Sequence, residues 1–193
     1  STAPGMDLRY DEEKVKSTWN FINKLWNASR FVLMNLEDFD MKDYSLENLK
    51  ESDKWIVTKL NLLIQNVREH MDKYEFNVVG SEIYSFIWDD FCDWYIELAK
   101  INMDNTTKSV LIYTLENILK LLHPFMPYVT EEIYQMLPNA LESIMISSYP
   151  VYDETKVFNS RLDDIIALIS RNKKIKLENN IGKEFFIEYD NTY

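Results

Sequence analysis

Apolar side chains recur along most of this chain at the three- and four-residue spacing of amphipathic helices, which predicts a mainly α protein. Only three glycines and five prolines interrupt the pattern, so hairpin turns have almost no support. The first helix is expected over about residues 11–36, with Asp11, Glu12 and Glu13 at the end where the helix dipole favours negative charge. Its core-facing side is predicted from eight positions: Val15, Trp19, Ile22, Leu25, Trp26, Val32, Leu33 and Leu36.

The rest of the pattern predicts five more helices and two short extended segments. Ser45 is expected to cap the second helix and Thr130 the fifth. Pro124 ends the fourth helix, because proline disfavours helical geometry in the residue before it. Extended patterns occupy residues 141–149 and 184–189. The helices are expected over about residues 46–74, 75–101, 107–122, 130–138 and 160–176.

These elements predict one helical bundle with additions at both ends. The bundle is expected over residues 11–150, after a linker of residues 1–10 and before a small α+β appendage of residues 151–193. The strand at 184–189 has no partner strand in the sequence, and an isolated strand is unstable. Either this strand pairs with a segment that the sequence does not identify, or the natural chain continues beyond Tyr193, and the missing partner favours the second alternative.

Composition limits the classes of function. The formal net charge of −11 argues against a generic nucleic-acid binder, which needs basic side chains to displace counterions, although a single suitably charged face would suffice. No apolar run approaches the roughly 18–20 residues of a membrane span, and the N-terminus lacks the features of a signal peptide. We therefore expect a cytoplasmic protein. The single cysteine, Cys92, lies among aromatic residues and is expected to be a buried apolar side chain rather than a nucleophile.

Motifs for catalysis, metal binding and nucleotide binding are missing from the sequence. His70 and His123 fall in different predicted helices, without a second His or a Cys at metal-ligand spacing, and there is no glycine-rich phosphate loop. Asp93 and Glu97, four residues apart, could share a helix face as in a carboxylate–metal enzyme. No Glu-x-x-His motif accompanies them, however, and Glu97 can pair with Lys100 instead. We predict no catalytic residue, metal or cofactor in this chain.

The polar side of the first helix carries a candidate RNA-binding stripe. On a helical wheel Asn20, Lys24, Asn27 and Phe31 fall nearly opposite the predicted core, with Arg30 to one side. An exposed ring can stack on a nucleobase while an ammonium group and amides bind phosphates and base edges. The alternative is that Phe31 simply packs against another helix or the acidic loop after residue 36.

Four blocks of sequence carry a family resemblance. The first, Asn23–Asn35 (NKLWNASRFVLMN), closely resembles the segment that opens the anticodon-binding domain of valine-tRNA ligases. The related isoleucine and leucine ligases share only its NK.WN...RF skeleton. The other blocks agree with the valine family in order: Phe91–Glu97, Leu121–Tyr134 and Ser143–Pro150. The resemblance covers about residues 1–150.

This resemblance implies a helical bundle of the class Ia aminoacyl-tRNA synthetase anticodon-binding type. The implied partner is the anticodon stem-loop of a valine tRNA. Lys24 and Phe31 match positions that we carry over as anticodon contacts, Phe31 by stacking on a base and Lys24 by its charge and donors. Asn20, Asn27 and Arg30 rest on the helical wheel alone.

The resemblance also places the chemistry outside this chain. The HIGH and KMSKS motifs, with which such ligases bind and activate ATP, are absent. We therefore expect ATP and Mg²⁺ to bind a separate catalytic domain. That domain is the second expected partner of this chain, after the tRNA, and the chain is expected to be a monomer. Lys173, Lys174 and Lys176 either touch the tRNA backbone or form a solvated helix end. The alternative function is a stand-alone helical protein-interaction domain descended from such a ligase.

Overall fold

Helices make up the regular structure of the described residues. The computed structural model describes residues 12–178, and the side chains of residues 12–174, and no described residue belongs to a strand. The predicted linker 1–10 and strand 184–189 lie outside this range. The mainly α class is confirmed. The helices longer than one turn are α1 (Glu12–Met34), α2 (Glu51–Asp72), α3 (Phe76–Ser85), η2 (Phe86–Tyr95), α4 (Ile96–Ala99), α5 (Asn105–Leu122), α6 (Pro127–Tyr134) and α7 (Leu162–Glu178).

The chain divides into two compact units between Phe158 and Asn159. The first contains α1 to α6, and the second contains α7, which the helical pattern at 160–176 predicted. The predicted boundary after Pro150 falls inside a segment that is bonded to the bundle. The Asp153 amide donates to Asn61 Oδ1 at 3.2 Å, and the Phe158 amide donates to Thr58 Oγ1 at 2.9 Å.

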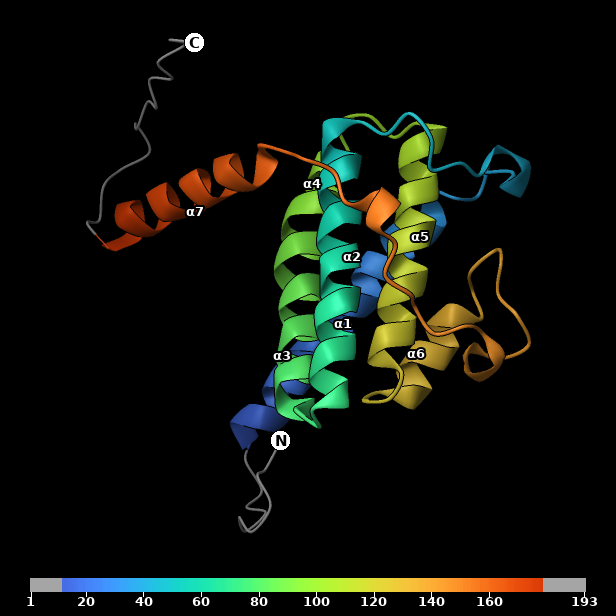
Figure 1. Ribbon diagram of the computed structural model, residues 1–193, viewed down its shortest axis with the longest axis horizontal. Coiled ribbons are helices and arrows are strands. Elements are labelled where there is room, and N and C mark those ends of the chain that lie inside the picture. Colours follow the sequence, from blue (N-terminus) through green and yellow to red (C-terminus); the bar gives the residue numbers. More distant parts are fainter. Residues whose placement is uncertain (1–11, 179–193) are drawn as a thin grey trace. The chain divides into compact units, whose positions relative to one another are not determined.

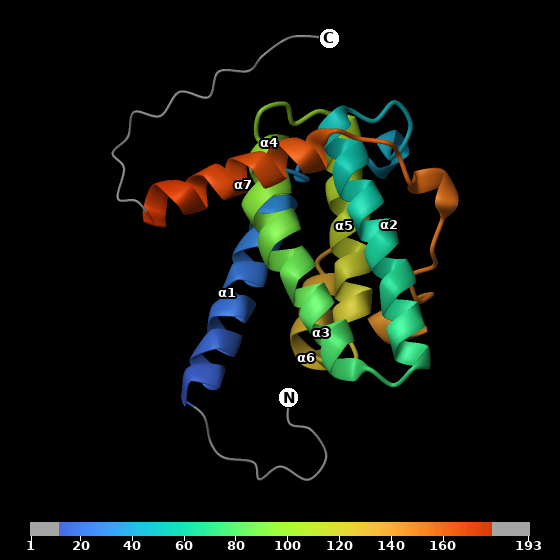
Figure 2. The same ribbon diagram turned by 60° about the vertical axis from the view of Figure 1, so that its left-hand side comes forward.

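The long helices of the first unit enclose its core. Helix α2 packs against α3, η2 and α5, while α1 packs against η2 and α5, and α6 covers one end of α5 (Figures 1 and 2). Burial of this apolar surface is the main stabilising term of the fold. The largest fully buried side chains are Trp55, Tyr95, Tyr134, Phe21, Phe91, Leu25, Ile56, Leu60, Ile64, Ile83, Ile87 and Leu111.

A π-helical segment, η2, interrupts the long helix predicted over 75–101. α3, η2 and α4 together form that helix, but η2 is wound with bonds to the fifth preceding residue, such as the Ile96 amide to the Phe91 carbonyl. π-Turns are rare and often occur at functional sites. The continuous helix was predicted correctly, whereas its π segment was not.

Two predicted helix starts are wrong, each for a local reason. α2 begins at Glu51 rather than residue 46, because Asn48 has a positive φ of 56° that a right-handed helix cannot contain. Ser45 therefore does not cap it. α6 begins with Pro127 in its first position, a site that suits proline. Thr130 lies inside that helix, fully buried, and donates to the Met126 carbonyl at 2.7 Å.

Residues 141–149 also differ from the prediction, because their only regular element is a short 3-10 turn, η3 (Ile144–Ile146). Ser143 caps this turn by accepting a hydrogen bond from the Met145 amide at 3.1 Å. The Glu131 carboxylate accepts from the Ile144 amide at 2.9 Å. These bonds to side chains replace the strand pairing that an extended segment would need.

A buried carboxylate joins three elements at one end of the bundle. Asp53, in the first turn of α2, is fully buried and accepts hydrogen bonds from the Tyr95 hydroxyl at 2.7 Å and the Thr107 hydroxyl at 3.1 Å. It also accepts from the Lys50 amide at 3.2 Å, and the Lys50 ammonium lies 3.6 Å away. Burial, and then the Asp53 carboxylate, raise the pKa of Tyr95 well above its usual value, so its hydroxyl stays a donor.

Candidate nucleic-acid interface

The buried side of α1 is rotated from the predicted one. Trp19 is 61% exposed and Val15 is 39% exposed, although both were placed on the core face. The residues that α1 buries are Phe21, Leu25, Ala28, Ser29 and Val32. On the helical wheel the centre of the buried side therefore lies roughly 70° nearer to Lys24 and Phe31 than predicted. Those two side chains therefore lie at the edge of the core rather than opposite it.

Lys24 is held by two residues of η2. Its Nζ lies 2.6 Å from Asp93 Oδ1 and 3.8 Å from the centre of the Trp88 ring. The Lys24 side chain is only 24% exposed. Sequence spacing could not predict these contacts, because Lys24 and Asp93 are 69 positions apart.

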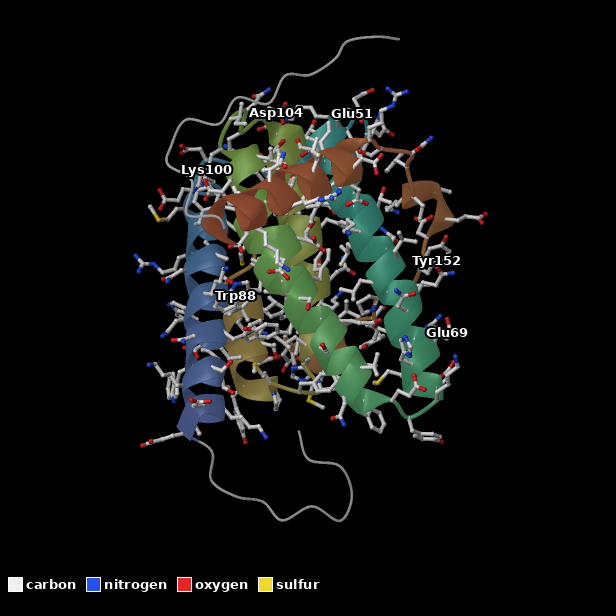
Figure 3. All side chains as sticks on the ribbon, turned by 90° about the vertical axis from the view of Figure 1, so that its left-hand side faces the viewer. Glu51, Glu69, Trp88, Lys100, Asp104 and Tyr152 are labelled. Atoms are coloured by element: carbon white, nitrogen blue, oxygen red, sulfur yellow. The ribbon has the colours of Figure 1, made fainter. Side chains whose placement is uncertain are left out.

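The Trp88 ring belongs to an aromatic stack that the sequence prediction missed. Phe21, which is buried, stacks on Tyr84 with ring centres 4.7 Å apart, and Tyr84 stacks on Trp88 at 5.7 Å. Trp88 is labelled in Figure 3, on the side of the bundle where α1 faces η2. The spacing of Tyr84 and Trp88, four residues apart, was the available signal. The stack anchors the ring that carries the Lys24 ammonium.

Phe31 is half-buried and faces a second lysine. The Nζ of Lys100 lies 5.3 Å from the centre of the Phe31 ring and 2.6 Å from Glu97 Oε1. The predicted pairing of Glu97 with Lys100 is therefore confirmed. Both cation–π contacts lie on the side of α1 that faces the chain segment 88–100.

The other candidates remain on open surface. Asn20, Asn27 and Arg30 are exposed on α1. In the separate C-terminal unit, Lys173 and Lys174 are exposed on α7, while the Lys176 side chain lies outside the described residues. The structure thus brings Lys24 and Phe31 into contact with the segment 88–100 and leaves the amides and Arg30 accessible beside them.

The carboxylates near this face are engaged by lysines. Asp93 bonds to Lys24 and Glu97 to Lys100, so each carboxylate of the pair considered for a metal enzyme has a lysine partner. Within residues 12–178 no group of three or more His, Cys, Asp and Glu side chains could hold a metal ion. In the same part of the chain, no helix is both long and apolar enough to cross a membrane.

Cys92 lies next to Asp93 and is expected to be unreactive. Burial raises the pKa of its thiol to about 12, and the neighbouring Lys24 only partly offsets this. Since an ordinary cysteine has a pKa near 8.5, the thiolate fraction at pH 8 falls by roughly two-thousandfold. We predict correspondingly slow modification by a disulfide reagent in the folded protein and ordinary rates in urea. Fast modification of folded protein would contradict the burial of Cys92.

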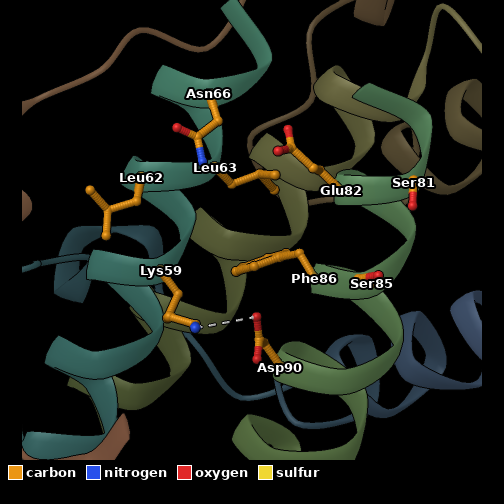
Figure 4. Close-up of a pocket in the computed structure, with 9 residues that line it drawn as sticks. All are labelled: Lys59, Leu62, Leu63, Asn66, Ser81, Glu82, Ser85, Phe86 and Asp90. Carbon is orange, nitrogen blue, oxygen red and sulfur yellow. Dashed lines mark ion pairs between the residues drawn. The ribbon is translucent and has the colours of Figure 1, made fainter. Parts of the chain in front are cut away.

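A hollow of about 380 Å³ lies elsewhere, between α2 and the helix formed by α3 and η2 (Figure 4). Lys59 and Asp90 face each other across it at 4.0 Å, and Glu82 Oε2 has no hydrogen-bond partner among the described residues. Its aromatic residue, Phe86, is 4% exposed. Because it offers two carboxylates and no accessible ring, this hollow is less suited to RNA than the α1 face.

Comparison with known proteins assigns the family. The sequence of residues 53–187 matches the protein family described as the anticodon-binding domain of tRNA ligase, and this chain belongs to that family. The chain is 48% identical over 198 residues to the valine–tRNA ligase of Staphylococcus aureus (strain MRSA252), covering 95% of this chain and 22% of that protein. It is 49% identical over 208 residues to the valine–tRNA ligase of Listeria innocua, covering 100% of this chain and 24% of that protein.

These findings confirm the resemblance to valine-tRNA ligases and extend it past the expected limit near residue 150, because the match to the Listeria innocua protein covers 100% of this chain. The chain spans between a fifth and a quarter of the length of these curated relatives. A solved structure supports the fold, namely the agnB2 LeuRS of Agrobacterium radiobacter K84 in a ternary complex with tRNA and LeuAMS. It has a TM-score of 0.59 and 19% identity, and it covers 81% of this chain and 19% of that chain.

Proposed function

We propose that this chain recognises the anticodon of a valine tRNA through the α1 face that contains Lys24 and Phe31. The observation that carries the anticodon function is the match to the anticodon-binding domain family over residues 53–187, together with the valine-tRNA ligases among the relatives. Helix α1 lies before the matched residues, so the choice of its face rests on the family resemblance of Asn23–Asn35. Phe31 stacks on an anticodon base, and Lys24 binds phosphate or a base edge. The exposed Asn20, Asn27 and Arg30 add polar contacts along the strand.

Catalysis belongs to the rest of the protein under this proposal. ATP and Mg²⁺ bind a catalytic domain outside this chain, which attaches valine to the bound tRNA in the cytoplasm. Lys173 and Lys174 are exposed on α7 and contribute to backbone affinity, together with Lys176. The chain itself is a monomer with two partners, the tRNA and the catalytic domain.

Replacing Phe31 by alanine is expected to weaken binding of a valine-tRNA anticodon stem-loop by about 5- to 150-fold, since stacking contributes on the order of 1–3 kcal/mol per base. The measurement is fluorescence anisotropy with the labelled stem-loop at low and physiological salt. Trp19→Ala is the matched control, because Trp19 is an exposed aromatic residue on another side of the same helix. Trp19→Ala is expected to bind within twofold of the parent.

Lys24→Ala is expected to weaken binding at low salt and to reduce the salt dependence, because one phosphate-binding charge is lost. Two results would overturn the anticodon assignment: no binding of any stem-loop at low salt, or equal losses in Phe31→Ala and Trp19→Ala. Absence of RNA binding by a folded chain would favour the protein-interaction alternative, with which the net charge of −11 agrees.

A further inference from the structure

We propose that Asp93 competes with RNA for Lys24. In the free protein the Asp93 carboxylate occupies the ammonium group, and on binding a phosphate oxygen replaces it while Trp88 keeps the ammonium in place. This inference rests on the proposed function, because it states how one residue of that site meets its ligand. Trp88 and Asp93 are positioning residues that act through Lys24.

The π-helical winding of η2 builds this arrangement. Trp88 and Asp93 are five residues apart, about one turn of a helix whose bonds reach the fifth residue. Both side chains therefore meet the same ammonium group, with the ring centre at 3.8 Å and the carboxylate oxygen at 2.6 Å. Because the Trp88 ring also holds the Lys24 ammonium, the ammonium keeps its position when a phosphate replaces Asp93.

The two contacts differ in how easily they are replaced. The Asp93 side chain is 51% exposed, so solvent and an incoming phosphate can reach it. Trp88 is instead fixed by its stack on Tyr84, which stacks on the buried Phe21. Exchange of anion at Lys24 therefore leaves the cation–π contact intact.

The negative charges of η2 affect how tightly this face binds RNA. Asp89 is exposed on the same segment, and Asp93 regains its full negative charge when a phosphate takes Lys24, so both weaken binding of a polyanion that offers charge alone. A cognate loop also stacks on Phe31, and this contact offsets the cost of displacing Asp93. Asp93 thereby lowers the affinity for both RNAs by the same factor, which leaves the ratio of their affinities unchanged but weakens contacts that rest on charge alone.

The test measures the affinity of the full chain for two labelled stem-loops of equal length, one with the valine anticodon and one with altered anticodon bases. Asp93→Asn is expected to bind both loops about two- to fivefold more tightly at low salt, the range for a partly exposed ion pair. Asp89→Asn is the control, because it removes an exposed carboxylate of the same segment. It is expected to gain less than half as much on a logarithmic scale.

The double variant Lys24→Ala/Asp93→Asn isolates the pair. Competition at Lys24 predicts that the gain from Asp93→Asn disappears when Lys24 is absent. Equal gains in Asp93→Asn and Asp89→Asn, or a gain that survives in the double variant, would overturn the proposal. Circular dichroism of each variant establishes that it is folded.

Two patterns separate this inference from the function on which it rests. If Phe31→Ala weakens binding and Asp93→Asn has no effect, the anticodon assignment holds and the competition is wrong. If neither the parent nor Asp93→Asn binds either loop at low salt, both are wrong.

Trp88 supplies a second readout. Trp88→Phe retains a ring face for the ammonium and is expected to bind within about threefold of the parent, whereas Trp88→Leu removes it and binds more weakly. Equal affinities for the two variants would contradict the positioning role of the ring.

Discussion

Replacing Asp53 by alanine is expected to lower the free energy of unfolding by about 3–5 kcal/mol, the usual cost of removing one partner from a buried charged network. The fully buried Tyr95 hydroxyl would lose its acceptor, and α2 would lose the carboxylate that accepts from the Lys50 amide in its first turn. Urea denaturation followed by circular dichroism measures the change. The expected loss of unfolding free energy is large because Asp53 is buried, whereas the same aspartate on an exposed helix end would contribute about 1 kcal/mol or less.

Glu51→Ala is the matched control for Asp53→Ala. Glu51 lies in the same first turn and interacts with the same helix dipole, but its side chain is 72% exposed and pairs with Lys54 at 3.5 Å. We expect a loss below about 1 kcal/mol. Tyr95→Phe should cost about 1–2 kcal/mol in the parent and less in the Asp53→Ala background, since the hydrogen bond is then already absent. Equal losses for Asp53→Ala and Glu51→Ala would contradict the network.

Phe91→Ala is expected to destabilise the protein by about 3–5 kcal/mol, because it leaves a cavity in the bundle core. Phe91 is fully buried in η2 and stacks on Tyr95 with ring centres 6.3 Å apart. It also lies two residues before Asp93, so the same cavity is expected to loosen the attachment of η2 to α1. The measurement is the midpoint and slope of urea unfolding, with the slope unchanged if the unfolded state is the same.

Two control variants help to interpret the stability loss of Phe91→Ala. Phe76→Ala removes the same side chain from the first turn of α3, where it is 49% exposed, and should cost well under half as much. Phe91→Leu keeps most of the volume and should cost about 1–2 kcal/mol, so it reports on the site even if Phe91→Ala does not fold. A Phe91→Ala loss no larger than that of Phe76→Ala would mean that η2 is not part of the core.

Helix identity could be predicted well from the sequence, and helix ends less well. Apolar spacing alone located α1, α5 and α7 to within a few residues. The wrong starts at Ser45 and Thr130 have one cause, since both residue types are good caps wherever they occur. Only the backbone shows that Asn48 has a positive φ and that Pro127 already starts α6.

The candidate face was located on the correct helix but described incorrectly. A helical wheel assigns the core side from the apolar character of all residues in a helix. Trp19 and Trp26 are large apolar residues, so they moved the predicted core side toward their own positions. Packing instead favours Ala28 and Ser29, whose small side chains let a neighbouring element approach closely. Trp19 is left exposed as a result, and Lys24 and Phe31 turn toward the segment 88–100.

The sequence by itself determined the helical class, the family and the helix that carries the proposed anticodon contacts, because periodicity and motif blocks are local properties of the chain. The tertiary structure decided what those contacts meet. The Lys24–Asp93 ion pair, the Trp88 ring beneath the ammonium and the buried Asp53 network each join residues more than forty positions apart. Such contacts depend on how helices rotate against one another, which is set by the packing of the whole core and by the winding of η2.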